Sequence, residues 1–193
     1  MKHLRTLSLM TMAGAALLAL FAAGSASATT FQSGGKNLPA GTEILMTLKA
    51  GTSSLFKDTS GITVETCTQS ESRSKISNET GASVIVTPIS QTTGGCSHTA
   101  DVIKLGEMKF EWTSGLNGKV FGVKNEYTYK STVFGISCVV ATSTATPAGT
   151  FTGTTSGNAT MDVNGVFSSN FCGDAVWTAT YTVTSPTPLA LVN

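Results

Sequence analysis

His98 is the residue whose type best suits acid–base chemistry near neutral pH, and it is the one histidine beyond the N-terminal segment. A hydrolytic triad needs a nucleophile, a base and a group that orients the base. The neighbours of His98 supply hydroxyls, and the nearest carboxylate, Asp101, stands three positions further on. Because an odd offset changes face in a strand, we expect Asp101 to point away from His98. The surroundings favour a structural or surface histidine, and we predict no catalytic residue.

Paired carboxylates could catalyse hydrolysis of a glycosidic bond. Glu107 and Glu111 are four residues apart, about 13 Å along one strand. That exceeds the separation of about 6.5–9.5 Å in inverting enzymes. Asp162 and Asp174 flank Asn164-Gly165, which indicates a tight turn, so these two carboxylates could meet in space. A hydrolase would need them to converge in a cleft, whereas turn and surface roles are commoner. The acidic residues expected to face solvent are Glu65, Glu71, Glu79, Glu107 and Glu111.

Four cysteines, Cys67, Cys96, Cys138 and Cys172, form an even set with wide spacing and no Cys-x-x-Cys pair. With a single histidine nearby, this set gives poor support to a zinc site, and we predict neither a metal nor a cofactor. Three disulfide pairings are possible. We favour Cys67–Cys96 and Cys138–Cys172, because each closes a local loop of about 30 residues, for which the chain-entropy model gives roughly 3.5 kcal/mol of stabilisation.

The first 28 residues have the three parts of an export signal. Lys2 and Arg5 precede an apolar stretch from Leu7 to Ala23, and Ala26-Ser27-Ala28 forms a small-residue cleavage site. The apolar stretch is short for a bilayer span, which needs about 20 residues, and an uncleaved membrane anchor is the alternative. We predict a signal peptide over 1–28, a mature chain without a membrane span, and a location outside the cell, at its surface or in the periplasm.

The composition excludes one class of partner. Without Lys2 and Arg5 the chain keeps ten basic and eleven acidic residues, so its net charge is −1. There is no basic excess to hold a phosphate backbone, and nucleic acid is therefore not expected as a partner. Residues 29–193 hold 30 threonines and 19 serines, while 12% of the whole chain is charged. We expect a hydroxyl-rich surface that meets an unidentified extracellular or surface partner, and the oligomeric state stays open.

The elements that would position these residues are strands, because a two-residue hydrophobic period dominates the chain after residue 42. Residues 44–48, 62–67, 108–112 and 175–184 alternate apolar and polar side chains, and the last range has a row of threonines on one face. No segment after residue 28 has convincing helical periodicity. The predicted core includes Met108, Phe110, Trp112, Trp177, Tyr181 and Val183.

Glycine, asparagine and proline indicate where these strands end. Asn117-Gly118 predicts a hairpin turn after the strand at 108–112, and Pro88 should end a β-branched run that begins at residue 83. Residues 29–42 predict an extended lead-in, and the prolines at 186 and 188 predict an extended tail. The Thr-, Ser- and Gly-rich stretch 142–158 predicts a solvated hairpin, with an adhesive surface as the alternative.

Many short strands separated by such turns predict an all-β fold. We expect one antiparallel β-sandwich domain over residues 43–193, with a barrel-like arrangement as the variant. For function we favour a secreted, non-catalytic extracellular or cell-surface protein. The first alternative is a carbohydrate- or small-ligand-binding module with an exposed aromatic platform, for which Tyr127 and Tyr129 are the candidates because Thr128 and Lys130 flank them. The second alternative is a hydrolase.

The run from Trp177 to Leu189 follows the pattern Trp-x-Ala-x-Tyr-x-Val-x-Ser-Pro-x-Pro-Leu. With the export signal, Pro39-Ala40-Gly41-Thr42 and Thr66-Cys67-Thr68, this run resembles a family of uncharacterised secreted bacterial all-β proteins rich in Thr and Gly. The resemblance covers most of the chain loosely and is specific over these 13 residues. It implies an exported all-β protein with cysteines placed like these, and it implies no activity. The chain departs from the pattern because no aromatic residue follows Leu189.

Overall fold

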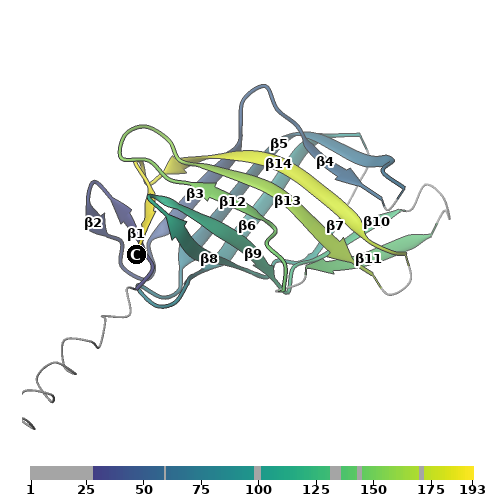
Figure 1. The fold of residues 1–193 in the computed structure, drawn as a ribbon. Helices are drawn as coiled ribbons and strands as arrows, with labels where there is room; N and C mark the ends of the chain where they lie inside the picture. The colour runs from purple at the N-terminus through teal and green to yellow at the C-terminus, as the bar shows by residue number, and fades with distance from the viewer. Residues whose placement is uncertain (1–27, 59, 98–100, 131–135, 143–144, 170–171) are drawn as a thin grey trace, which may run out of the picture.

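The computed structural model describes residues 28–58, 60–97, 101–130, 136–142, 145–169 and 172–193 (Figure 1). His98 and all but the last residue of the predicted signal peptide lie outside these ranges. Within them the chain forms strands and connecting turns, and no helix is long and apolar enough to cross a membrane.

The strands follow one another with short connections. The first seven are β1 (Thr30–Ser33), β2 (Lys36–Asn37), β3 (Glu43–Leu48), β4 (Ser54–Lys57), β5 (Thr63–Ile76), β6 (Val84–Cys96) and β7 (Asp101–Lys104). The others are β8 (Glu107–Ser114), β9 (Asn117–Val123), β10 (Glu126–Lys130), β11 (Ser137–Thr142), β12 (Gly149–Thr152), β13 (Thr160–Ser168), β14 (Ala175–Ser185) and β15 (Ala190–Val192). Their pairings are antiparallel, which confirms the predicted all-β antiparallel class.

Strand β14 is where the main sheet returns on itself. One edge of β14 pairs with β13, and the other pairs with β3 toward the C-terminal end of β14 and with β4 toward its N-terminal end. Both β3 and β4 pair with β5, and the sheet continues through β6, β8, β9 and β12 back to β13. The architecture is a near-closed ring of strands, which is the barrel-like variant of the predicted sandwich.

The wall of this ring has a seam. Residues 84–86 of β6 pair with β8, whereas the remainder of β6 pairs with β5 alone within the described residues. The strands β7, β10 and β11 form a ribbon that joins the ring through β11 and β13. In the part of the chain that the structure describes, no backbone pairing connects β6 to this ribbon. Within the described residues the ring of strand pairings is therefore incomplete between β6 and β7.

A small sheet lies at one end of the molecule (Figure 1). β15 pairs with β1, and β1 pairs with β2 across a tight turn in which Gly34 and Gly35 have φ angles of 57° and 76°. Phe31 of β1 is 1% exposed and makes edge contacts with Phe110 and Phe151, with centroids 5.1 and 5.5 Å away. The expected lead-in is thus a hairpin that packs on the core, and the C-terminal tail resumes pairing after Leu189.

The hairpin predicted after the strand at 108–112 is confirmed by the pairing of β8 with β9, but its predicted turn at Asn117-Gly118 is wrong, because these residues begin β9. The chain turns earlier, at Gly115 and Leu116, where Gly115 has a φ of 57° that favours glycine. Gly118 serves packing instead. A Cβ at this position would lie 2.3 Å from Cδ2 of Leu191 in β15 and 2.6 Å from the carbonyl oxygen of Glu111.

The predicted turn at Asn164-Gly165 is also wrong, because both residues lie within β13. Gly165 pairs with Trp177 of β14, and a Cβ there would lie 3.3 Å from Cβ of Ala148 and 3.4 Å from the ring of Phe167. The glycine therefore makes room for neighbouring side chains in the interior. A glycine beside an asparagine is a turn signal only when no close packing requires it.

Two stretches that the sequence predicts to lie between strands are themselves part of strands. The Thr-rich stretch 142–158 contains β12, which pairs with β9 and β13 on its two edges and buries Phe151 at 1% exposure. This part is not a solvated hairpin, because Phe151 anchors it in the core. β6 continues through Pro88, and the irregularity there is local: Ser74 pairs with Pro88 and Arg73 with Ser90, so Ile89 is an extra residue.

The core has two clusters of buried side chains. Of the predicted core residues, Phe110, Tyr181 and Val183 are at most 2% exposed, while Met108, Trp112 and Trp177 are half-buried against these clusters. The cluster near β1 and β15 contains Phe31, Phe110, Phe151, Leu189 and Leu191, among others. The other contains Phe56, Val64, Cys138, Val140, Phe167 and Ala175. Trp177 packs against both clusters.

The disulfides are Cys67–Cys96 and Cys138–Cys172, which confirms the favoured pairing. Cys67 and Cys96 are register partners in β5 and β6, so this bond fastens two neighbouring strands. Cys138 of β11 is bonded to Cys172, which precedes β14. Disulfides persist in oxidising compartments, so the two bonds indicate an extracytoplasmic location.

Candidate ligand-binding site

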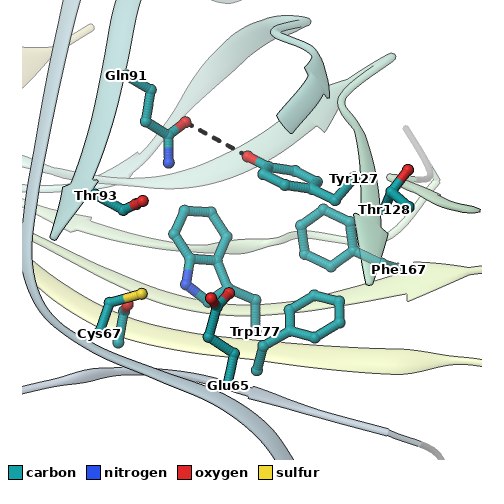
Figure 2. A pocket seen from close by; sticks show the side chains of 10 residues that line it. Glu65, Cys67, Gln91, Thr93, Tyr127, Thr128, Phe167 and Trp177 are labelled. Atoms are coloured by element: carbon teal, nitrogen blue, oxygen red, sulfur yellow. Dashed lines mark hydrogen bonds between the residues drawn. The ribbon is translucent and has the colours of Figure 1, made fainter. Parts of the chain in front are cut away.

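The ring is not filled at the end where its wall has the seam. Two adjoining chambers lie in its interior, and Gln91, Tyr127, Phe167 and Trp177 line both of them. The outer chamber is completed by Ser54, Phe56, Glu65, Cys67, Thr93 and Thr128 (Figure 2). The inner chamber extends between the two core clusters toward Met108, Val120, Met161 and Tyr181. Protein interiors are normally close-packed, so an unfilled space of this kind is a candidate binding site.

The chambers are small. Including the space at their mouths, they leave about 540 and 630 Å³ free of atoms. Within them the centre of a water molecule has about 50 and 60 Å³ in which to move. A single buried water needs about 10–15 Å³ on this measure. Each chamber therefore suits a few waters or a compact group with few non-hydrogen atoms.

Aromatic rings form most of the wall that the two chambers share. The ring of Tyr127 makes an edge contact with Phe167 at a centroid distance of 5.1 Å and lies 6.0 Å from Trp177. The centroids of Phe167 and Trp177 are 6.1 Å apart, and Phe56 lies 6.0 Å from Phe167. These rings come from β4, β10, β13 and β14; β13 and β14 are consecutive, whereas β4 and β10 are distant from them in the sequence. They gather here because β14 pairs with both β13 and β4.

Tyr127 spans the interior toward the opposite wall. Its phenol Oη donates a hydrogen bond of 3.5 Å to Oε1 of Gln91 in β6 (Figure 2). Burial raises the pKa of Tyr127 well above its usual range, and the nearby Tyr181 acts in the same direction, while the bond to Gln91 opposes them. The phenol therefore stays neutral at physiological pH.

A second polar contact lies deeper in the ring. The hydroxyls of Ser70 and Tyr181 are 3.0 Å apart, both residues are buried, and either oxygen can be the donor. Burial raises the pKa of Tyr181 to about 12, and the hydrogen bond to Ser70 lowers it in part. Buried hydroxyls need such partners, because an unsatisfied polar group costs about 1–3 kcal/mol.

Glu65 lines the outer chamber and is half-buried, so the prediction that it faces solvent is wrong. Glu65 is the register partner of Phe56, and partners across two strands share a face. The inward face of β5 then changes, because Thr68 and Gln69 are consecutive exposed residues between the buried Cys67 and Ser70.

Gly95 in β6 lies against this change of face. It has a φ of 60°, and a Cβ there would lie 2.2 Å from Oγ1 of Thr68. Glycine is therefore the residue that fits beside Thr68. Uninterrupted alternation along β5 would place Glu65 on the outer face of the sheet. The interruption at Thr68 and Gln69 becomes evident only beside Gly95 of the neighbouring strand β6.

The carboxylate of Glu65 lies within 4.8 Å of the sulfurs of Cys67 and Cys96. These sulfurs are bonded to each other and cannot act as thiolate ligands. The group therefore offers a metal ion no more than one carboxylate. The described residues that form this group give no basis for a metal site.

The predicted site residues have separate outcomes. Tyr127 faces the interior, so it is part of the chambers and not an exposed platform. The side chain of Tyr129 lies outside the described part of the structure, as does His98.

Asp162 is exposed and accepts a hydrogen bond of 2.7 Å from Oγ1 of Thr180. Asp174 is six residues before Thr180 along the same extended stretch, about 20 Å away. The two aspartates therefore do not converge in a cleft.

The sequence reasoning missed Phe56, Gln91 and Phe167 and assigned Trp177 to the core. Trp177 and Phe167 do lie on inward faces, and alternation along β13 and β14 indicates this. Nothing in the neighbouring sequence indicates that the space beside Trp177 and Phe167 is unfilled.

The chain matches no family model, no curated protein and no solved structure. The resemblance of the C-terminal pattern to a secreted family therefore stays a prediction.

Proposed function

We propose that the protein is an exported, non-catalytic binding protein that holds a small ligand in the two chambers. The observation that carries the proposal is an unfilled interior space surrounded by Phe56, Tyr127, Phe167 and Trp177. Ligand sites are typically apolar cavities with a small number of polar groups, and Glu65, Gln91 and Thr93 are such groups at this site.

Two other functions compete with this proposal. A structural or surface protein needs no interior space, and its hydroxyl-rich face would carry the function. A hydrolase needs a catalytic set, and the separation of Asp162 and Asp174 removes the pair that the sequence offered. The chambers favour the binding function, because neither a structural protein nor a hydrolase needs large aromatic side chains around an unfilled space.

The test uses phenol, a compact uncharged aromatic compound, in isothermal titration calorimetry. We expect saturable binding to the wild-type protein. Thr93→Trp places a large side chain at the rim of the outer chamber and should weaken binding at least about tenfold, the equivalent of 1.4 kcal/mol. Thr92→Trp is the matched control, since Thr92 is the neighbouring residue of β6 and does not line either chamber. No binding, or equal loss in both variants, would overturn the proposal.

We also propose that residues 1–28 direct export and are removed by cleavage after Ala28, which leaves the protein in the periplasm, at the cell surface or in the medium. The support is the order of a basic start, an apolar stretch and a small-residue site. N-terminal sequencing of the exported protein should begin at or next to Thr29. Recovery of an intact Met1 in the membrane fraction would favour the uncleaved anchor instead.

A further inference from the structure

The wall of the inner chamber carries no charge. Among the described residues that line it there is no lysine, arginine, histidine, aspartate or glutamate. Its ionisable side chains are the phenols of Tyr127 and Tyr181, and burial raises the pKa of both, so both are neutral at physiological pH. An ion that enters such a space loses its hydration and finds no opposite charge in return. The inner chamber therefore disfavours a charged ligand of either sign.

Most hydroxyl and amide side chains of this wall already have hydrogen-bond partners within the protein. Asn125 is an example, because its Oδ1 accepts from the backbone N–H of Gly106. Two groups have no hydrogen-bond partner among the described residues: the hydroxyl of Ser72 and the amide nitrogen of Gln91. The side chains that do have partners are Asn125, Tyr127, Thr142 and Tyr181.

Ser72 and Gln91 lie side by side. They are register partners in β5 and β6, and both line the inner chamber. Cβ atoms of such partners are about 4.5–5.5 Å apart, so the two polar groups can reach the same point. Gln91 gives its oxygen to Tyr127, and its nitrogen points toward Trp177 (Figure 2). A hydroxyl or carbonyl oxygen of a ligand has two lone pairs and can accept from both Ser72 and Gln91.

Ser72 is the middle member of a row of serines on β5. Ser70, Ser72 and Ser74 are two residues apart, so they share the inward face of the strand. Ser70 is bonded to Tyr181, whereas the Oγ of Ser74 is fully buried and has no partner among the described residues. This side of the interior therefore has more hydroxyls than the protein itself satisfies, which favours a ligand that brings a hydrogen-bonding atom.

The rest of the inner wall is apolar. Its side chains include Met108, Val120, Met161, Phe167 and Trp177. Methionine side chains are flexible and adapt to the shape of a bound group. The centre of a water molecule has about 60 Å³ in which to move, so the apolar body of a ligand can be no larger than about one ring.

From these observations we propose that the ligand is a small uncharged molecule with an apolar body of about one ring and one hydroxyl or carbonyl oxygen, which is held by Ser72 and Gln91 in the inner chamber; this inference rests on the proposed binding function. Ser72 and Gln91 select the oxygen and fix its position. The methionines and aromatic rings contact the apolar body.

The experiment compares phenol with toluene, in which a methyl group replaces the hydroxyl and the shape is kept. Isothermal titration calorimetry measures both compounds with the wild type and with Ser72→Ala. We expect Ser72→Ala to weaken phenol binding about three- to tenfold, the equivalent of one neutral hydrogen bond, and to change toluene binding less than twofold. Ser90→Ala is the matched control, because Ser90 is an exposed serine of β6 that lines neither chamber.

A second measurement needs no variant, in case Ser72→Ala does not fold. Benzyl alcohol, benzoate and benzylammonium have the same ring and differ in the charge of the attached group. Each ion should bind the wild type at least about tenfold more weakly than the alcohol, because the inner chamber offers neither ion an opposite charge.

The outcomes separate the inference from the function on which it rests. The inference would be overturned by phenol binding that Ser72→Ala leaves unchanged, by equal weakening of phenol and toluene, or by an ion that binds as tightly as benzyl alcohol. In each of these cases the binding function would stand. Failure of the wild-type protein to bind phenol at all would overturn the binding function itself.

Discussion

The phenol Oη of Tyr127 lies 3.5 Å from Oε1 of Gln91, and this hydrogen bond joins β10 to β6. Within the described residues these two strands share no backbone pairing. The contact therefore crosses the interior at the end where the wall has its seam. Because both residues line the two chambers, the bond is placed to influence how readily a ligand enters and leaves.

Replacing Tyr127 by Phe should speed ligand exchange. The ring remains in the wall, but the bond to Gln91 is lost, so β6 and the ribbon of β7, β10 and β11 separate more easily. We expect the association and dissociation rates of phenol to rise together, as measured by NMR line-shape analysis of the ligand resonances. The free energy of unfolding should fall by about 0.5–1.5 kcal/mol.

Hydrogen exchange provides an independent readout of the same variant. Backbone amides of β10 should exchange faster in Tyr127→Phe, while those of β14 should stay protected, because β14 pairs with β13, β3 and β4 and not with the ribbon of β7, β10 and β11. Unchanged exchange rates for both ligand and amides would show that the bond between Tyr127 and Gln91 does not hold the seam.

The buried pair Ser70 and Tyr181 should behave as a coupled unit. Removing either hydroxyl leaves the other unsatisfied, so Tyr181→Phe and Ser70→Ala should each lower the free energy of unfolding by about 1–3 kcal/mol. The double variant should cost clearly less than the sum of the two, because no orphaned hydroxyl remains. A double-mutant cycle in urea measures this coupling, and strict additivity would contradict the 3.0 Å contact.

Alkaline pH should destabilise the fold through its buried phenols. The pKa of Tyr181 is raised to about 12, above the value of about 10 expected in the unfolded chain. Between these values the folded state holds a proton that the unfolded state has lost, so the stabilising contribution is complete below pH 10 and disappears as pH rises toward 12. The pKa of Tyr127 is raised as well and contributes in the same direction.

Urea unfolding at a series of pH values checks this dependence. Lysines titrate in the same range, so the informative quantity is the difference between wild type and Tyr181→Phe. The variant should lose stability less steeply above pH 10. Equal slopes would mean that Tyr181 ionises in the folded protein as it does in the unfolded chain.

Two glycines of the β8–β9 hairpin differ in the reason why an added side chain is unfavourable. At Gly115 the reason is backbone strain, and at Gly118 it is close packing. Gly115→Ala should cost about 1–2 kcal/mol, because its φ is 57° and no heavy atom lies within 4 Å of the added Cβ. Gly118→Ala should cost more, about 2–3 kcal/mol, because the Cβ meets Leu191 and the carbonyl of Glu111. The reverse order in thermal or urea unfolding would contradict the role given to Gly118.

Much of the fold follows from alternation along single strands. Residues 175–184 show their buried and exposed faces directly, and the buried faces of Tyr181 and Val183 agree with the prediction. The disulfides are also predictable, because each pair closes a local loop. The errors at Asn117-Gly118 and Asn164-Gly165 have one cause: a glycine placed by close packing looks the same in the sequence as a glycine required by a turn. Packing excludes a side chain at Gly118 and leaves only tight space for one at Gly165.

The site is less predictable than the fold. Its wall combines Phe56, Glu65, Gln91, Tyr127 and Trp177 from five strands, and their meeting depends on long-range pairing. Alternation gives the two faces of β10 but does not say which face is inside, so the polar neighbours of Tyr127 suggested exposure. Whether the interior of the ring is filled or leaves a chamber depends on the packing of side chains from many strands. No single stretch of the sequence contains that information.

The most direct test of ligand binding in the chambers uses the two tryptophans. Trp177 lines both chambers, whereas Trp112 lines neither and donates from Nε1 to the carbonyl of Gly115, 3.0 Å away. The indole N–H resonances can be assigned by NMR with Trp112→Phe and followed during titration with phenol. We predict a saturable shift of the Trp177 resonance and an unmoved Trp112 resonance. Two unmoved resonances, or equal shifts of both, would contradict binding in the chambers.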